Sequence, residues 1–212
     1  MVNAAKRINL DSEYRFSSVD LRYHRRDNGR VLRLVDERRL EELIRDRMRR
    51  ELMSVTRRYQ AGRIDGRSWQ RQAGEVLRRG HYESAAFAVG GEGGLPPAAK
   101  RAIDALIAEE LGYLAGLGED IRSGRTTMPV ALRVARYALA TSLSISKARH
   151  EAHKAAGFTK AKRTLDPRVG VLHCKHCPGL ATNGWVGIDK VVPRGWECEC
   201  RNACRCTVRY RR

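Results

Sequence analysis

Residues 36–60 read DERRLEELIRDRMRRELMSVTRRYQ, and their apolar side chains recur every three or four positions. That spacing places the apolar side chains on one face of an α-helix, opposite a face filled with arginines. The apolar positions are Leu40, Leu43, Ile44, Met48, Leu52, Val55 and Tyr59. A helix with one apolar face must bury that face against a partner, so this stretch predicts a helical bundle.

Three further amphipathic stretches follow the first. Glycines and prolines separate them, because glycine loses much backbone entropy in a helix and proline removes a donor. Asp65 or Ser68 can cap the second helix, and Thr126 or Thr127 can cap the fourth. We therefore expect a mainly α fold whose helical domain, residues 36–157, is a bundle of about four helices. The further helices are expected near residues 65–89, 97–122 and 126–156.

Residues 1–35 have a different pattern, because apolar and polar residues alternate loosely there. Asn28-Gly29 lies between two such runs and is a strong signal for a hairpin turn. An N-terminal hairpin is one interpretation. The other is an extended arm that becomes ordered only on a neighbouring molecule.

Residues 158–212 form a third segment, which contains all six cysteines of the chain. The cysteines come in three pairs, Cys174 and Cys177, Cys198 and Cys200, and Cys204 and Cys206. The segment has few apolar residues, and a unit of about 55 residues with so small a core usually needs a metal ion or disulfides. We therefore expect a small Cys-rich module held together by cross-links.

A structural zinc ion is the cross-link that we expect. The start of the chain shows no apolar stretch typical of a secretory leader, and clustered thiols in a reducing compartment favour metal over disulfides. A pair of disulfides remains the alternative. We expect one of Cys204 and Cys206 to bind and His173 and His176 to face solvent or support the ligands. The expected Zn²⁺ ligands are Cys174, Cys177, Cys200 and Cys204, with Cys198 and Cys206 as alternates.

The C-terminal pattern resembles the signature of tailed-phage head-morphogenesis, or minor capsid, proteins. The resemblance covers roughly residues 165–209 and rests on LHCKHC at 172–177, GWV at 184–186, Pro193, Gly195 and CRNACRCTV at 200–208. It matches Cys174, Cys177, Cys204 and Cys206 to the cysteines of the family, with Cys200 near the place where many members have a histidine. The His-Pro element of many members is absent and Cys198 is additional, which leaves the fourth ligand open. The helical stretches at 59–64, 69–70 and 88–91 are similar to such proteins too.

The resemblance implies a structural role without enzymatic chemistry. A member of this family is a virion component that acts at the phage head or portal and is assembled in the host cytoplasm. Its implied partners are head, portal or capsid proteins and further copies of itself, with an additional contact to packaged DNA.

The charge of the chain suggests a second interpretation. The net charge is +18, and residues 158–212 carry twelve Lys and Arg against four Asp and Glu. Such an excess favours a polyanionic partner, so the module is alternatively a zinc finger that binds nucleic acid. The arginines expected to contact phosphates are Arg194, Arg201, Arg205, Arg209, Arg211 and Arg212.

Membrane and catalytic functions are not expected. No apolar run is long enough to span a bilayer. No catalytic motif occurs, and the adjacent acids Glu109 and Glu110 do not face each other on a helix. His150 and His153 lack the neighbouring glutamate of a helical zinc motif, so we expect a surface pair.

Overall fold

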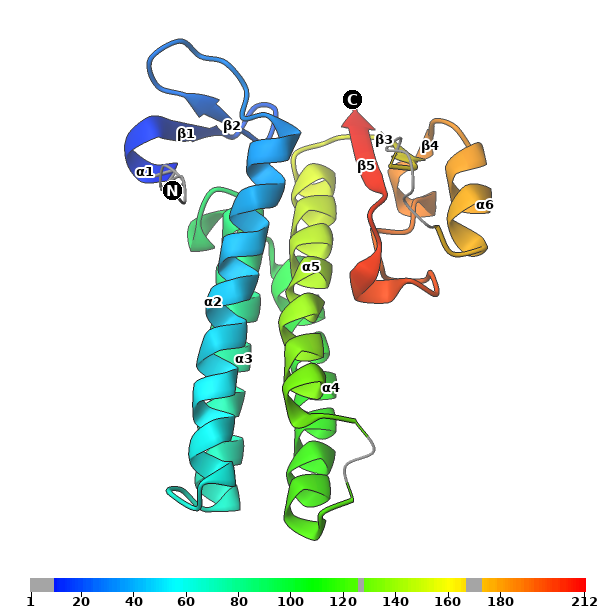
Figure 1. Cartoon of the computed structure of the whole chain (residues 1–212). Coiled ribbons are helices and arrows are strands. Elements are labelled where there is room, and N and C mark those ends of the chain that lie inside the picture. The colour runs from blue at the N-terminus through cyan, green and yellow to red at the C-terminus, as the bar shows by residue number, and fades with distance from the viewer. Residues whose placement is uncertain (1–9, 126–127, 167–172) are drawn as a thin grey trace, which may run out of the picture.

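A computed structural model of the chain describes residues 10–125, 128–166 and 173–212. Four long helices dominate the described residues (Figure 1). They are α2 (Leu34–Gln60), α3 (Gly66–Ala88), α4 (Pro97–Ser123) and α5 (Val130–Ala155). Before them lie α1 (Leu10–Glu13), β1 (Tyr14–Ser17) and β2 (Arg22–Arg25), and between α3 and α4 lies η1 (Glu92–Gly94). After them come β3 (Lys160–Thr164), α6 (His176–Thr182), β4 (Val186–Gly187), η2 (Ile188–Lys190), η3 (Arg201–Ala203) and β5 (Thr207–Arg211).

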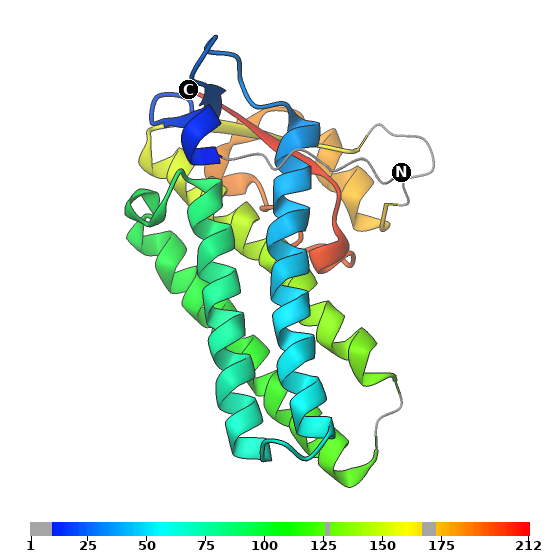
Figure 2. The ribbon, with the colours of Figure 1, turned by 60° about the vertical axis from the view of Figure 1, so that its left-hand side comes forward.

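The mainly α fold predicted from the sequence is confirmed, with a helical bundle, an N-terminal hairpin and a C-terminal cysteine cluster. Helix α3 packs against α2, α4 and α5, and α5 also packs against α2 and α4 (Figure 2). Asp65 caps α3, since its carboxylate accepts a hydrogen bond from the backbone N–H of Ser68 at 2.7 Å. The other predicted caps, Thr126 and Thr127, lie outside the described residues. No described helix has the length and apolar content of a membrane span.

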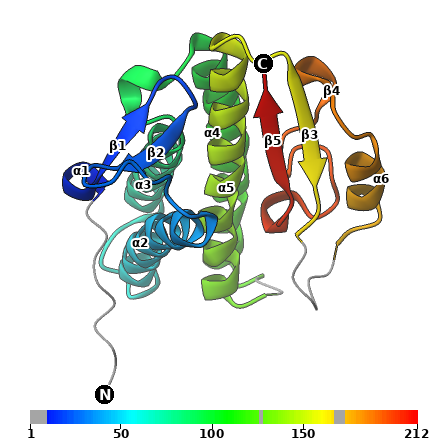
Figure 3. The ribbon, with the colours of Figure 1, turned by 90° about the horizontal axis from the view of Figure 1, so that it is seen from above.

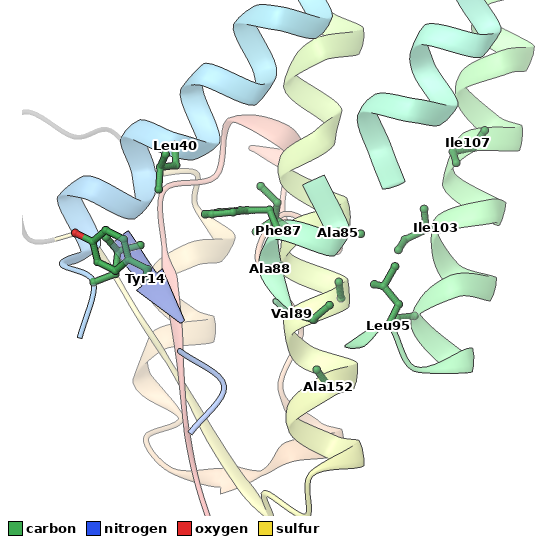
Figure 4. Packing of buried hydrophobic residues seen from close by; sticks show 14 residues of the cluster. Tyr14, Leu40, Ala85, Phe87, Ala88, Val89, Leu95, Ile103, Ile107 and Ala152 are labelled. Atoms are coloured by element: carbon green, nitrogen blue, oxygen red, sulfur yellow. The ribbon is translucent and has the colours of Figure 1, made fainter. Parts of the chain in front are cut away.

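The bundle has two hydrophobic clusters along its length. One surrounds Trp69, which is fully buried among side chains of α2, α4 and α5. The other contains Tyr14 from the hairpin beside Leu40 and Phe87 (Figure 4). The hairpin is therefore part of the bundle core. Leu43, predicted for the buried face of α2, is 51% exposed.

The hairpin turns earlier in the chain than the sequence suggests. Strands β1 and β2 pair antiparallel, with Ser17 opposite Arg22, so the turn falls at residues 18–21. The Asn28-Gly29 turn makes a second reversal, which a bridge between His24 and Val31 closes. Within the described residues this segment is thus a hairpin packed on its own chain and not an extended arm.

Gly90 allows the hairpin to sit close to the end of α3. Its φ of +79° is left-handed, and a Cβ there would lie 2.2 Å from Cγ of Phe16 in β1. We expect Gly90→Ala to lower the free energy of unfolding by about 2–4 kcal/mol, through backbone strain and overpacking together. Chemical denaturation followed by circular dichroism measures the loss.

Gly124→Ala is the matched control for that substitution. Gly124 has a similar φ of +67°, but nothing lies within 4 Å of its Cβ position. This variant is expected to lose only the strain contribution, about 1–2 kcal/mol. Equal losses in the two variants would show that Phe16 does not resist the added methyl group.

Candidate metal centre

The C-terminal module lies beside α5, as the view from above shows (Figure 3). Its sheet has the order β4-β3-β5, with both neighbours antiparallel to β3. The indole Nε1 of Trp196 donates a hydrogen bond to the carbonyl oxygen of Leu143 on α5 at 3.2 Å. Asp166, whose side chain is 1% exposed, pairs with Arg38 of α2 at 3.2 Å. These contacts hold the module against α5 and α2 of the bundle.

The cysteines gather at one point although three separate stretches of chain carry them. Cys177 lies in the first turn of α6, Cys174 just before that helix, and the others around η3 and ahead of β5. The Sγ of Cys177 is 3.5 Å from that of Cys174 and 3.4 Å from that of Cys200. The Sγ atoms of Cys174 and Cys200 are 3.3 Å apart. Cys177, Cys198, Cys204 and Cys206 are buried, and Cys174 and Cys200 are half-buried.

The six thiols form two groups that share Cys177. Within each group the ligand atoms lie within 4.8 Å of one another. The first group is Cys174, Cys177, Cys198 and Cys200, and the second is Cys177, Cys204 and Cys206. This arrangement of soft sulfur ligands can bind a metal ion. Three of the four ligands expected from the sequence meet in the first group, whereas Cys204 lies in the second and Cys198 completes the first.

The two Cys-x-Cys pairs bring both of their cysteines into the cluster in different ways. Cys198 and Cys200 lie in a turn, and their sulfur atoms come within 3.5 Å of each other. Cys204 and Cys206 are both buried around exposed Arg205, because residues two apart in an extended segment share one side. The geometry therefore gives no reason for only one of Cys204 and Cys206 to enter the cluster.

The sulfur atoms are not joined as disulfides in the described residues. All six cysteines are free. The shortest recorded Sγ–Sγ distance, 3.3 Å, far exceeds the ~2.05 Å of a disulfide bond. Burial opposes ionisation of Cys174, but hydrogen bonds from the backbone and thiol of Cys200 outweigh it and lower the pKa of Cys174 to about 6. Burial raises the pKa of the adjacent thiols Cys177 and Cys200, so Cys174 ionises most readily of these three. Metal binding requires the thiolate form.

Arg163 is the residue of this site that the sequence pattern did not reveal. It lies on β3, is 3% exposed, and directs its guanidinium into the cysteine cluster. Its Nη2 donates to the Sγ of Cys204 at 3.0 Å and to that of Cys198 at 3.3 Å. Burial disfavours the charge of the guanidinium, yet the negative sulfur of Cys204 raises the pKa of Arg163 above its usual value. Along β3 the buried residues Ala161 and Arg163 alternate with the more exposed Lys160, Lys162 and Thr164, a pattern that only the folded structure reveals.

The histidines divide between the cluster surface and the bundle. His173 Nε2 lies 3.3 Å from the carbonyl oxygen of Asp166, and His176 is exposed. Neither histidine belongs to a group of described side chains that could hold a metal ion. The expectation of a surface pair at His150 and His153 is wrong, since they are 4% and 6% exposed. Tyr210 of β5 stacks on His153 with ring centroids 3.8 Å apart, so the docked module covers both histidines.

Acidification is expected to weaken the contact between β5 and α5 at His153. Burial lowers the pKa of His153 from 6.5 to about 4, so the folded chain resists protonation that the unfolded chain accepts. The stability contributed is present above pH 6.5 and is lost as the pH falls toward 4. Between pH 7 and 5.5 we expect wild type to lose about 1 kcal/mol more than His153→Gln, which cannot titrate there. Urea denaturation at the two pH values measures the loss of stability of each protein. The same loss for wild type and for His153→Gln would contradict this expectation.

A basic face lies on the sheet of the module. Lys160 pairs with Arg211 and Lys162 with Arg209 across β3 and β5, so four cations share one face. The guanidinium carbon of Arg211 lies 4.7 Å from the Trp185 ring, and Lys162 Nζ lies 5.8 Å from it. We call these five residues the basic sheet face. The sequence pattern named only two of them, because the partners on β3 depend on strand pairing.

The other arginines predicted for nucleic acid do not join that face. Arg194 pairs with Glu41 at 3.4 Å and is largely buried there. Arg201 lies 3.9 Å from Glu109 of α4, and Arg212 donates to the carbonyl oxygen of Val19 at 3.0 Å. Arg205 is exposed near the cysteine cluster. The six predicted arginines therefore do not form a single surface.

Comparisons of the chain with protein-family models, with curated proteins and with solved structures give no match. The function of the chain must therefore be inferred from its own residues.

Proposed function

We propose that the chain is a structural component of a tailed-phage virion, acting at the head or portal and assembled in the host cytoplasm. Its C-terminal module is braced by one structural Zn²⁺ ion. The observation that carries the proposal is the closed, all-cysteine cluster in a segment whose own apolar cluster has, among the described residues, only three buried members, Ala161, Ile188 and Val191. The resemblance of residues 165–209 to the head-morphogenesis signature supports the virion role.

Zinc is the ion that best suits these ligands. Four thiolates in a tetrahedral set are typical of structural zinc, with metal–sulfur distances of about 2.3 Å. The first group supplies four sulfur atoms within 4.8 Å of one another. When all four positions are filled by protein sulfur, none remains for water or substrate, so the ion braces the fold and performs no catalysis.

The position of the module supports a role in protein assembly. The cluster fixes α6 and β5 as one unit, and ion pairs with α2, α4 and α5 fix that unit on the bundle. A rigid module of this kind presents a constant surface to head or portal subunits and to other copies of the chain. We propose those proteins as its partners.

The virion role is tested by asking whether purified phage particles contain the chain. Mass spectrometry of gradient-purified particles from the host culture is expected to find it at a reproducible copy number relative to the portal subunit. Treatment of intact particles with protease and nuclease, followed by repurification, controls for adsorbed protein. Absence from the treated particles, with the chain abundant in the lysate, would overturn the proposal.

A nucleic-acid role is the second candidate, and the basic sheet face favours it. Like charges directly opposite each other destabilise a sheet, so a polyanion that neutralises them binds favourably. Trp185 offers a flat ring beside these cations, as in surfaces that bind single strands. Among the described residues no carboxylate forms an ion pair with Lys160, Lys162, Arg209 or Arg211.

The salt dependence of DNA binding separates this candidate from the first. If the basic sheet face binds phosphates, Lys162→Gln with Arg209→Gln should reduce the slope of log affinity against log salt by about 2. Arg50→Gln with Arg57→Gln removes the same charge from exposed positions on α2 and should leave the slope unchanged. Equal effects of both pairs would show non-specific attraction to the net charge.

A further inference from the structure

The cysteine cluster offers two positions for a cation, and they differ in how many sulfur atoms surround them. The first lies among four sulfur atoms, those of Cys174, Cys177, Cys198 and Cys200. The second lies among three, those of Cys177, Cys204 and Cys206. A tetrahedral metal ion is complete at the first position and lacks one ligand at the second.

The guanidinium of Arg163 lies at the edge that joins the two positions. Its Nη2 is 3.0 Å from Cys204 Sγ, 3.3 Å from Cys198 Sγ and 3.7 Å from Cys177 Sγ. Nη1 donates to the carbonyl oxygen of Val192 at 3.4 Å. The guanidinium also forms a hydrogen bond with the thiol of Cys206. Among the described residues, these four sulfur atoms and this carbonyl are the recorded hydrogen-bond acceptors of the Arg163 side chain. It has no recorded carboxylate partner there.

A buried guanidinium requires negative charge beside it, because arginine stays protonated in proteins and desolvation of its charge is costly. Within residues 10–125, 128–166 and 173–212, thiolates are the only groups in recorded contact that can supply that charge. Cys204, which lies outside the four-sulfur group, makes the shortest of the contacts. A metal ion at the first position would leave the sulfur of Cys204 unbound. The guanidinium neutralises the charge of that sulfur.

The guanidinium also occupies space that a second ion would need. Zinc–sulfur distances are about 2.3 Å, so a second ion would lie close to all three sulfur atoms of its position. Nη2 already lies 3.0 Å from Cys204 Sγ and 3.7 Å from Cys177 Sγ, and the guanidinium also forms a hydrogen bond with the third, Cys206. Two cations cannot share that place.

We infer that the cluster holds two cations of different kinds, one metal ion among Cys174, Cys177, Cys198 and Cys200, and the Arg163 guanidinium beside Cys204, where it excludes a second metal ion. This inference rests on the metal of the proposed function. It assigns Arg163 as the positioning residue that sets the metal stoichiometry of the six cysteines. Without Arg163, six thiolates can hold two tetrahedral ions if two sulfur atoms bridge them.

The test is the number of metal ions per full-length chain. Native mass spectrometry with excess Zn²⁺ under reducing conditions, and the number of ¹¹³Cd resonances after exchange with cadmium, both report it. Wild type and Arg163→Lys, which keeps the positive charge, are expected to bind one ion. Arg163→Met, which has a neutral side chain of similar length, is expected to bind two. Arg163→Gln serves as a second neutral variant if circular dichroism shows that Arg163→Met has lost its helices.

The outcomes distinguish this inference from the proposal on which it rests. Two ions in wild type, or one ion in a folded neutral variant, would overturn the inference and leave the structural metal in place. No ion in wild type would overturn the structural metal itself and the inference with it. One ion in wild type and two in the neutral variants support both.

Discussion

Cys177→Ser is expected to abolish stoichiometric metal binding and to leave residues 158–212 open to protease, while the helices of the bundle remain. Cys177 is fully buried and is the one described cysteine that belongs to both sulfur groups. Structural zinc contributes roughly 10–16 kcal/mol of apparent binding free energy, which exceeds what so small a core can supply. The module should therefore unfold when the ion is lost.

The helices should survive because neither bundle cluster uses a cysteine. The cluster that contains Tyr14 consists of side chains from the hairpin segment, the four long helices and the connection between α3 and α4, and the buried side chains of the cluster around Trp69 come from the four long helices. Elemental analysis, limited proteolysis and circular dichroism measure the three expected results separately. Cys206→Ser is the matched control, since Cys206 is equally buried but lies outside the four-sulfur group. If Cys206→Ser loses its metal as completely as Cys177→Ser does, the assignment of the first group is wrong.

Trp69→Ala is expected to reduce the free energy of unfolding of the bundle by about 3–5 kcal/mol. Trp69 has no exposed surface, stacks on Tyr59 with ring centroids 5.4 Å apart, and donates from Nε1 to Oγ1 of Thr56 at 3.2 Å. Gly118 of α4 packs against the same ring, since a Cβ there would lie 2.8 Å from it. Truncation removes the ring from between three helices and leaves the Thr56 hydroxyl without its donor.

Urea denaturation followed by circular dichroism measures that loss. Trp69→Phe keeps most of the ring volume and should retain part of the stability, which separates packing from the indole hydrogen bond. Trp185→Ala, in the module, should leave the unfolding of the bundle almost unchanged. If Trp69→Ala and Trp185→Ala lower the free energy of unfolding of the bundle by similar amounts, the packing of Trp69 is not the cause of the loss.

The helices were predictable because their signals are local. The apolar spacing of residues 36–60 and the carboxylate of Asp65 act within a few residues of chain, and the observed α2 and the cap of α3 follow from them. The position of the hairpin turn was not predictable in the same way. Asn28-Gly29 does form a turn, but packing of Tyr14 and Tyr23 against the bundle selects the earlier pairing of β1 with β2.

The candidate site was predictable in composition and not in detail. Cysteine spacing points to a metal-binding cluster, but the sequence does not show that Cys198 turns back beside Cys200. Arg163 and the burial of His153 depend on strand β3 and strand β5 lying against the cluster and α5, which are contacts between distant parts of the chain. Local patterns carry no information on such contacts.

From the docking of the module on the bundle we expect a fixed order of folding. Trp196 meets Leu143, Arg38 meets Asp166 and Glu41 meets Arg194, so each docking contact joins residues that are far apart in sequence. Ribosomes release the bundle segments before the module, and the bundle can bury its own apolar faces at once. The module needs a finished surface on α5 and, under the proposed function, an ion. If the module holds the proposed metal ion, we expect metal capture to be the last step in the maturation of each chain. Chains made during metal starvation are then expected to accumulate with a native bundle and an unfolded C-terminal end.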